Sequence, residues 1–174
     1  ARDYLQRAAQ DPQTTPQMRF RIASMLSAAG DTAPAIKVLE ALPAGASRDL
    51  MLADLYARQG KTTDAAKIYS GFDVLSAKNP SAAVIQSAAD FQAQQGNLEL
   101  ARKYLARLKE TPLSTAQRDL VLAGFDEQYG SAQQALDEYT RATQASGDNA
   151  VTWRALAGYQ LRHGQFDAAI AAAD

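Results

Sequence analysis

The chain has 174 residues, and 47% of them are hydrophobic, which is enough to bury a sizeable core. Its 18 basic residues nearly balance its 19 acidic residues. Because the two signs are interspersed along the chain, we expect neither nucleic acid nor an anionic membrane surface as a partner. The absence of cysteine excludes disulfides, thiolate metal sites and cysteine nucleophiles, and no apolar run approaches the roughly 18 residues of a membrane span, so we expect no membrane insertion in this segment.

The composition also indicates the fold class. Alanine supplies 37 residues, and it favours helix and lets helices approach closely because its side chain ends at Cβ. Valine, isoleucine and threonine are sparse, and no convincing segment alternates apolar and polar residues with a period of two. We therefore predict an all-α protein.

One joint recurs along the chain: a helix, a turn glycine and a second helix with alanine five residues beyond the glycine. The clearest copy is the stretch from Phe91 to Leu105, where we expect a left-handed backbone at Gly96 and close helix packing at Ala101. The other copies pair Gly30 with Ala35, Gly60 with Ala65, Gly130 with Ala135 and Gly164 with Ala169. The glycines are 30, 36, 34 and 34 residues apart, which is typical of stacked helix pairs, since one helix hairpin cannot bury its apolar face alone.

The joints divide the chain into a leading half repeat, residues 1–15, and repeats 16–45, 46–81, 82–115, 116–149 and 150–174. Residues 1–15 match residues 101–115 at seven of fifteen positions without a gap, so we expect the chain to begin on the second helix of a repeat. Neither end has the polar cap that repeat arrays require. We therefore expect residues 1–174 to be one segment of a longer array, with flanking repeats on both sides.

Local chemistry predicts several helix starts. Thr15 precedes Pro16, a combination typical of an N-cap followed by the first helical residue. Ser81, Thr115 and Asn149 are predicted to cap the helices that follow them.

Two junctions depart from the period. Pro43 stops a helix and shortens the connection around residues 43–47, whereas residues 70–80 lengthen theirs by two. We therefore expect uneven stacking of the repeats around the second repeat. This irregularity could be a local change of curvature or a place where a partner docks. Sequence drift in an old repeat, without a function, is the favoured explanation.

The period and the pattern of small and aromatic residues resemble the tetratricopeptide repeat (TPR). The second block fits the motif at Leu52, Ala53, Tyr56, Ala65, Tyr69 and Phe72, and the last at Trp153, Leu156, Ala157, Phe166 and Ala169, although Asp49 and Gln160 stand where the motif has aromatic residues. The resemblance implies a right-handed superhelical solenoid of antiparallel helix pairs, with about five repeats after the half repeat. It also implies a non-enzymatic scaffold for protein–protein interaction.

In the TPR family, the first helix of each repeat lines a concave binding face. Carried over to this chain, the resemblance implies a binding face comprising Phe20, Leu50, Asp54, Arg58, Gln86, Asp90, Gln94, Leu120, Glu127, Arg154, Leu161 and Arg162, with Gly124 and Gln128 on the same face of the fourth repeat. Family members that hold chaperone C-terminal carboxylates use lysine and asparagine at positions that here carry Phe20, Ser24, Leu50 and Asp54. The resemblance therefore excludes that ligand.

Little in the sequence could carry chemistry. His163 is the only histidine and directly precedes a turn glycine, a position typical of an exposed helix end. No histidine pair, phosphate loop or nucleophile elbow occurs, and the adjacent acidic pairs 126–127 and 137–138 point to different helix faces. We predict no catalytic residue, cofactor or metal site here, and no enzyme activity.

The alanine- and glutamine-rich composition, the absence of cysteine and the loosely kept motifs are similar to the periplasmic TPR regions of bacterial exopolysaccharide-export proteins. One such protein is the cellulose-secretion component that joins a repeat array to an outer-membrane barrel in cellulose biosynthesis. That likeness implies a periplasmic spacer and docking arm between a synthase and an exit pore.

Two alternatives to the periplasmic scaffold stay open. One is a cytoplasmic regulatory receptor that binds a peptide or small ligand. The other is a set of substrate-holding repeats of an enzyme whose catalytic domain lies outside this segment. A secretion signal upstream would favour the periplasmic interpretation, and an appended output or DNA-binding domain would favour the receptor.

Overall fold

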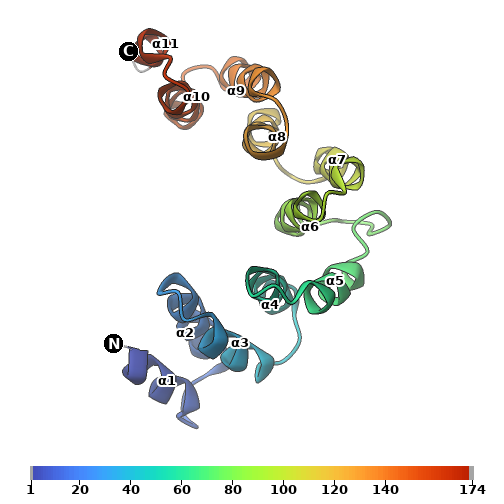
Figure 1. The fold of residues 1–174 in the computed structure, drawn as a ribbon, viewed down its shortest axis with the longest axis vertical. Helices are drawn as coiled ribbons and strands as arrows, with labels where there is room; N and C mark the ends of the chain where they lie inside the picture. The colour runs from blue at the N-terminus through green and yellow to red at the C-terminus, as the bar shows by residue number, and fades with distance from the viewer. Residues whose placement is uncertain (1, 173–174) are drawn as a thin grey trace. The chain divides into compact units, whose positions relative to one another are not determined.

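The computed structural model describes residues 2–172, and the prediction of an all-α protein is confirmed for them (Figure 1). No strand occurs in this range. The elements are α1 (Arg2–Gln10), α2 (Pro16–Ala28), α3 (Thr32–Glu40), α4 (Ala46–Arg58), α5 (Thr62–Gly71), α6 (Ala82–Gln94), α7 (Leu98–Leu105), the 3-10 helix η1 (Ala106–Glu110), α8 (Thr115–Tyr129), α9 (Ala132–Ser146), α10 (Ala150–Arg162) and α11 (Phe166–Ala171).

Successive helices pack as hairpins, with one turn glycine in each. The pairs are α2 with α3, α4 with α5, α6 with α7, α8 with α9, and α10 with α11. Each predicted repeat contains one of these pairs, and residues 1–15 contain α1, which packs on α2. We call α2, α4, α6, α8 and α10 the first helices.

The helix pairs fall into two compact units, one up to Asp73 and the other from Val74 onward. In the first unit, α1 to α4 share a buried cluster of Ala9, Ile22, Ala23, Leu26, Ala35, Ile36, Leu39, Leu42, Leu52 and Leu55. In the second, α8, α9 and α10 share a cluster of Ala123, Ala135, Tyr139, Leu156 and Tyr159. The division falls inside the irregular junction at residues 70–80.

Alanine lies where the helices of each hairpin approach most closely. The alanines five residues beyond the turn glycines are at most 3% exposed, and those seven residues before the glycines are at most 8% exposed. These ten positions are Ala35, Ala65, Ala101, Ala135 and Ala169, and Ala23, Ala53, Ala89, Ala123 and Ala157. The expectation that Ala101 lies at a closely packed position is confirmed, and its four counterparts share that burial.

Gly96 has a φ of 81°, which confirms the left-handed backbone expected there. In the same hairpin the Asn97 N–H donates to the Gln92 carbonyl at 2.8 Å and the Gly96 N–H to the Ala93 carbonyl at 2.9 Å. These two bonds define a Schellman motif, which satisfies carbonyls that the end of a helix leaves without partners. Gly30, Gly60 and Gly164 have the same sign of φ and the same pair of bonds.

Gly130 departs from the other four glycines. Its φ is −103°, and α8 continues to the residue directly before it. Ser131 then forms a capping box with Gln134, in which the Ser131 Oγ accepts from the Gln134 N–H and the Gln134 side chain accepts from the Ser131 N–H. Because this box satisfies the first N–H groups of α9, that helix can begin without the left-handed turn used elsewhere.

The predicted N-caps have mixed outcomes. The Thr15 side chain accepts from the Met18 N–H, and the Asn149 side chain accepts from the Val151 N–H, so both caps are confirmed. Ser81 occupies the N-cap position of α6 without a side-chain hydrogen bond. The prediction for Thr115 is wrong: Ser114 is the N-cap of α8, because it forms a capping box with Gln117 and leaves Thr115 as the first helical residue.

Arg107 forms hydrogen bonds with the first residues of the second unit. The Arg107 guanidinium, on η1, donates to the carbonyl oxygens of Val74 and Ala77, both at 2.6 Å, and pairs with Glu110. Buried backbone carbonyls require such partners when no regular element supplies them. Hydrogen bonds from Arg107 therefore join residues 74–77 of the irregular junction to η1.

Candidate functional site

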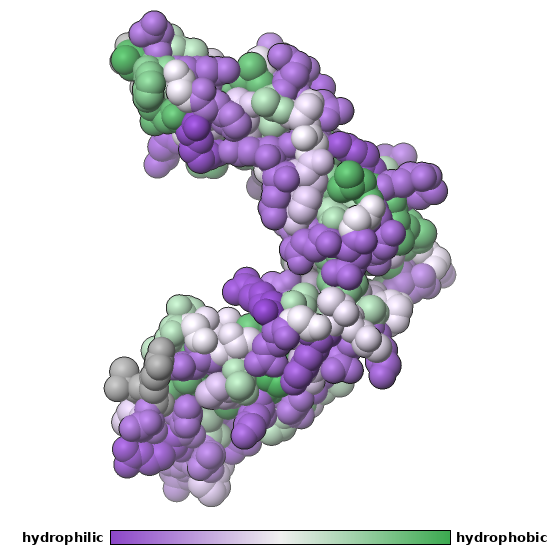
Figure 2. Space-filling model, in the orientation of Figure 1, coloured by the Kyte–Doolittle hydropathy of each residue, from purple (hydrophilic) through white to green (hydrophobic). Residues whose placement is uncertain are grey.

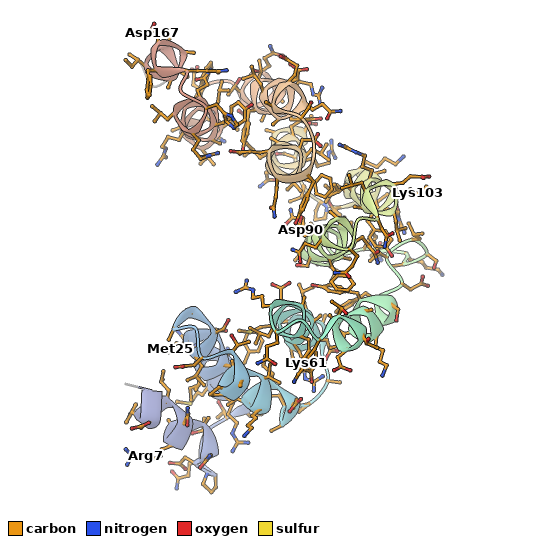
Figure 3. The ribbon with its side chains drawn as sticks, in the orientation of Figure 1. Arg7, Met25, Lys61, Asp90, Lys103 and Asp167 are labelled. Atoms are coloured by element: carbon orange, nitrogen blue, oxygen red, sulfur yellow. The ribbon has the colours of Figure 1, made fainter. Side chains whose placement is uncertain are left out.

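Three of the eight residues predicted on the binding face of the second unit lie around one hollow between α6 and α8. The hollow has a volume of about 390 Å³. Gln86 and Asp90 from α6 and Leu120, Gly124 and Gln128 from α8 line it, together with Leu105, Val121 and Phe125. Figure 3 shows Asp90 on the α6 side of its hairpin, away from Lys103 on α7. The structure thus brings together three of the twelve predicted residues, Gln86, Asp90 and Leu120, from two successive first helices.

The hollow has an apolar floor and a polar rim. Phe125 and Leu105 are buried, whereas Leu120 and Val121 are half-buried. Gly124 leaves open space beside the α8 backbone, because a Cβ added there would meet no heavy atom within 4 Å. Such a mixture of apolar surface and a few placed polar groups is typical of ligand-binding clefts.

Amide side chains extend the rim toward the end of α8. Gln94 and Gln128 both donate to the hydroxyl of Tyr129, at 3.4 and 2.8 Å, and the Tyr129 ring packs on Phe125 with centroids 5.0 Å apart. Tyr129 is not among the residues predicted on the binding face, so the sequence analysis missed the part that it has in this rim. The four-residue spacing of Phe125 and Tyr129, which places both on one helix face, was the available signal.

Glu127 and Arg162 form an internal ion pair. The guanidinium of Arg162 on α10 donates two hydrogen bonds to Glu127 on α8, both at 2.8 Å, and the Tyr139 hydroxyl donates to the same carboxylate at 2.9 Å. The Arg162 bonds hold the pKa of Glu127 below its usual range against the opposing effect of burial. Burial, followed by the bond to Glu127, raises the pKa of Tyr139 to about 12, so its hydroxyl stays a donor at neutral pH.

His163 belongs to this ion-pair cluster. Its ring stacks on Tyr159 with centroids 4.3 Å apart, and its Nε2 lies 3.7 Å from a Glu127 oxygen. Glu127 and Arg162 were predicted on the binding face, yet their charged groups are already satisfied by each other. Their arrangement connects α8, α9 and α10.

We expect Glu127→Gln to destabilise the chain at neutral pH and much less in acid. The folded-state pKa of Glu127 is lowered, so its stabilisation is present above the unfolded value of about 4.3 and is lost as the pH falls through the lower folded-state pKa. Because Arg162 is more than half exposed, we expect a loss of only about 0.5–1 kcal/mol at pH 7. Urea unfolding of both proteins at pH 7 and pH 3.5 measures this, and a difference that does not shrink in acid would contradict it.

The predicted residues of the first unit lie on α2, which carries Phe20, and on α4, which carries Leu50, Asp54 and Arg58. Asp54 accepts from the Tyr69 hydroxyl at 3.0 Å, and Arg58 lies 3.8 Å from Asp54 one helical turn away. Leu50 is half-buried on the same helix. Phe20 packs against the core and lines a separate hollow of about 320 Å³ beside Pro43.

Arg154 and Leu161 lie on α10, outside the hollow between α6 and α8. The Arg154 Nε donates to the Ala150 carbonyl at 3.0 Å, and this side chain lines another hollow, of about 450 Å³, next to Trp153. Leu161 is exposed. Phe166 and Ile170, both more than 60% exposed, lie on α11, over which Figure 2 shows apolar atoms gathered.

Neither protein-family models nor curated proteins give a match to this chain. The resemblance to the TPR therefore depends on the residues themselves: the period, the turn glycines and the paired alanines.

Within the described residues, the helices offer no acidic or histidine cluster suited to a metal. Between residues 2 and 172, no group of three or more histidine, aspartate and glutamate side chains lies close enough together to hold a metal ion. None of the helices in the described part of the chain has the length and apolar character that crossing a membrane requires. The polar groups that do gather, in the hollow between α6 and α8, are suited to hydrogen bonding.

Proposed function

We propose that the chain is a non-enzymatic TPR-type scaffold that binds an extended polypeptide segment in the hollow between α6 and α8. One observation carries the proposal: positions assigned to a binding face from the repeat register come together on two successive first helices around one hollow. Burial of the alanines at matching positions of all five hairpins supports that register.

An extended polypeptide fits this chemistry because its backbone N–H and C=O groups are free to pair. Side-chain amides can both donate and accept hydrogen bonds, and Gln86 and Gln128 place two of them on opposite walls of the hollow. A helix, by contrast, satisfies its own backbone groups. The apolar floor at Leu120 and Phe125 would take a partner's aliphatic or aromatic side chain.

The wider proposal is a right-handed superhelical solenoid of about five repeats and a half repeat, continued by flanking repeats. We propose a periplasmic location, as a spacer and docking arm in bacterial exopolysaccharide secretion. Its support is compositional: many alanines and glutamines and no cysteine.

Filling the hollow at Gly124 tests the binding site. Peptides are first selected from a displayed random library for binding to the native chain. These peptides should bind Gly124→Trp at least tenfold more weakly, because the indole would occupy the hollow. Gly124→Ala is the matched control: it should keep binding and gain about 0.5–1 kcal/mol in unfolding free energy, since glycine inside a helix is unfavourable and the site has room for a methyl group.

Fluorescence anisotropy measures the affinities, and thermal unfolding shows whether Gly124→Trp folds. Failure to enrich any peptide, or selected peptides that bind a folded Gly124→Trp variant as tightly as the native chain, would overturn the proposal.

A further inference from the structure

A second hollow, in the first unit, carries positive charge without acidic side chains. It has a volume of about 420 Å³ and lies between α1, α2 and α3. Its lining comprises Gln6, Ala9, Gln10, Arg19, Ala33, Pro34, Lys37, Val38 and Ala41. None of the predicted binding-face residues belongs to this set, so the hollow is a separate surface.

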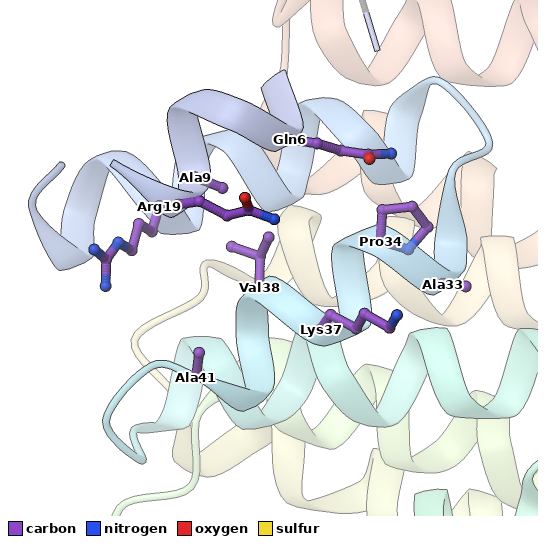
Figure 4. Close-up of a pocket in the computed structure, with 9 residues that line it drawn as sticks. Gln6, Ala9, Arg19, Ala33, Pro34, Lys37, Val38 and Ala41 are labelled. Carbon is purple, nitrogen blue, oxygen red and sulfur yellow. The ribbon is translucent and has the colours of Figure 1, made fainter. Parts of the chain in front are cut away.

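The two cations stand at opposite ends of the hollow. Figure 4 shows Gln6 from α1 and Lys37 from α3 extending on either side of Pro34, whereas Arg19 lies at the other end, with its guanidinium directed away from Ala9 and Val38. Ala9 and Val38 lie between these ends. A ligand lying along the hollow would therefore meet a positive charge, an apolar strip and a second positive charge.

Arg19 is incompletely satisfied. Its Nη2 donates to the carbonyl of Asp11 at 3.1 Å, but its Nε is buried and has no hydrogen-bond acceptor among the described residues. Within residues 2–172, neither Arg19 nor Lys37 forms an ion pair with a carboxylate. A partly desolvated guanidinium without a counter-charge is unfavourable, and an incoming carboxylate would offset that cost.

The amides of the lining favour an extended backbone. The side-chain amides of Gln6 and Gln10 form no hydrogen bond within the described part of the chain, so each can donate to a carbonyl and accept from an N–H of a bound segment. Their spacing of four residues places them on one face of α1.

We propose that this hollow binds a short extended acidic peptide segment, with one carboxylate at Arg19, another at Lys37 and an aliphatic side chain on Ala9 and Val38. This site is independent of the hollow between α6 and α8.

A designed peptide tests the assignment directly. The probe is a fluorescein-labelled peptide of three Glu-Leu-Pro units, in which proline prevents helix formation. Peptides with glutamine or lysine in place of glutamate are the controls. Anisotropy should show binding of the acidic peptide alone, weakening at least threefold between 50 and about 300 mM salt because exposed charges are screened.

Single variants locate the binding. Lys37→Gln and Arg19→Gln should each weaken the acidic peptide about three- to tenfold. Lys67→Gln, which removes the same charge from an exposed position on α5, should leave it unchanged. Since Arg19 also bonds the chain itself, Lys37→Glu is the more decisive variant, and it should abolish binding without a change in the thermal midpoint.

No binding of the acidic peptide at millimolar concentration would overturn the proposal. Equal binding of the neutral peptide, or equal loss in Lys67→Gln and Lys37→Gln, would also overturn it. Gly124→Trp should not affect this peptide, so failure here and failure of the site between α6 and α8 are separable.

Discussion

Replacing Ala101 with leucine should lower the free energy of unfolding by about 1–3 kcal/mol, the usual cost of forcing extra methylene groups into a packed core. Ala101 has no exposed surface, and Ala89 on the other helix of the same hairpin has none either. Protein interiors are packed as densely as organic crystals. The larger leucine side chain must therefore move α6 and α7 apart. The lower free energy of unfolding should appear as a lower midpoint of urea unfolding.

Ala83→Leu is the control for this substitution. Ala83 lies near the start of α6 and is not among its buried residues, and surface changes of this kind usually alter stability by less than about 0.5 kcal/mol. Similar, small losses in both variants would show that close approach at Ala101 does not matter. A loss confined to Ala101→Leu would identify the alanine positions as the determinants of hairpin packing.

The sequence was sufficient to predict the helices, the hairpins and the buried alanines because these depend on residues close together in the chain. The glycine of a Schellman motif and the alanine five residues later belong to the same helix–turn–helix segment. The hairpins repeat this local sequence pattern. Of the residues that line the hollow between α6 and α8, the repeat register placed Gln86, Asp90, Leu120, Gly124 and Gln128 on the binding face, whereas it did not place Leu105, Val121 and Phe125 there.

Interactions between distant side chains could not be predicted in this way. Glu127 was assigned to a binding face, but Arg162, 35 residues away, occupies its carboxylate. Gly130 has the sequence context of a turn glycine, yet the capping box at Ser131 changes its backbone. A Cβ at Gly130 would lie 2.5 Å from an Asp126 oxygen. Glycine is required there for space and not for a left-handed φ.

The position of Asp126 depends in turn on Arg102. The Arg102 guanidinium, on α7, donates to the Asp126 carboxylate of α8 at 2.8 Å, and the Asp126 side chain is only 6% exposed. The same guanidinium lies 5.7 Å from the centre of the Phe125 ring. This contact joins the α6–α7 hairpin to α8.

Arg102→Met should therefore lower the free energy of unfolding by about 2–3 kcal/mol. Removal of one partner from a buried ion pair costs about 3–5 kcal/mol because the other charge stays buried, and we reduce that figure because Arg102 itself is 46% exposed. Lys103→Met, which removes the neighbouring exposed cation and its pair with Glu99, should leave the unfolding midpoint nearly unchanged.

A double-mutant cycle with Asp126→Asn separates the charge interaction from the loss of packing. Once the carboxylate is neutral, Arg102→Met no longer leaves a buried charge without a partner, so its cost should fall by at least about 1 kcal/mol. Equal costs in the native and Asp126→Asn backgrounds would mean that Arg102 stabilises α8 through its contact with Phe125 alone. A smaller cost in Asp126→Asn would show that the charge pair itself joins α7 to α8.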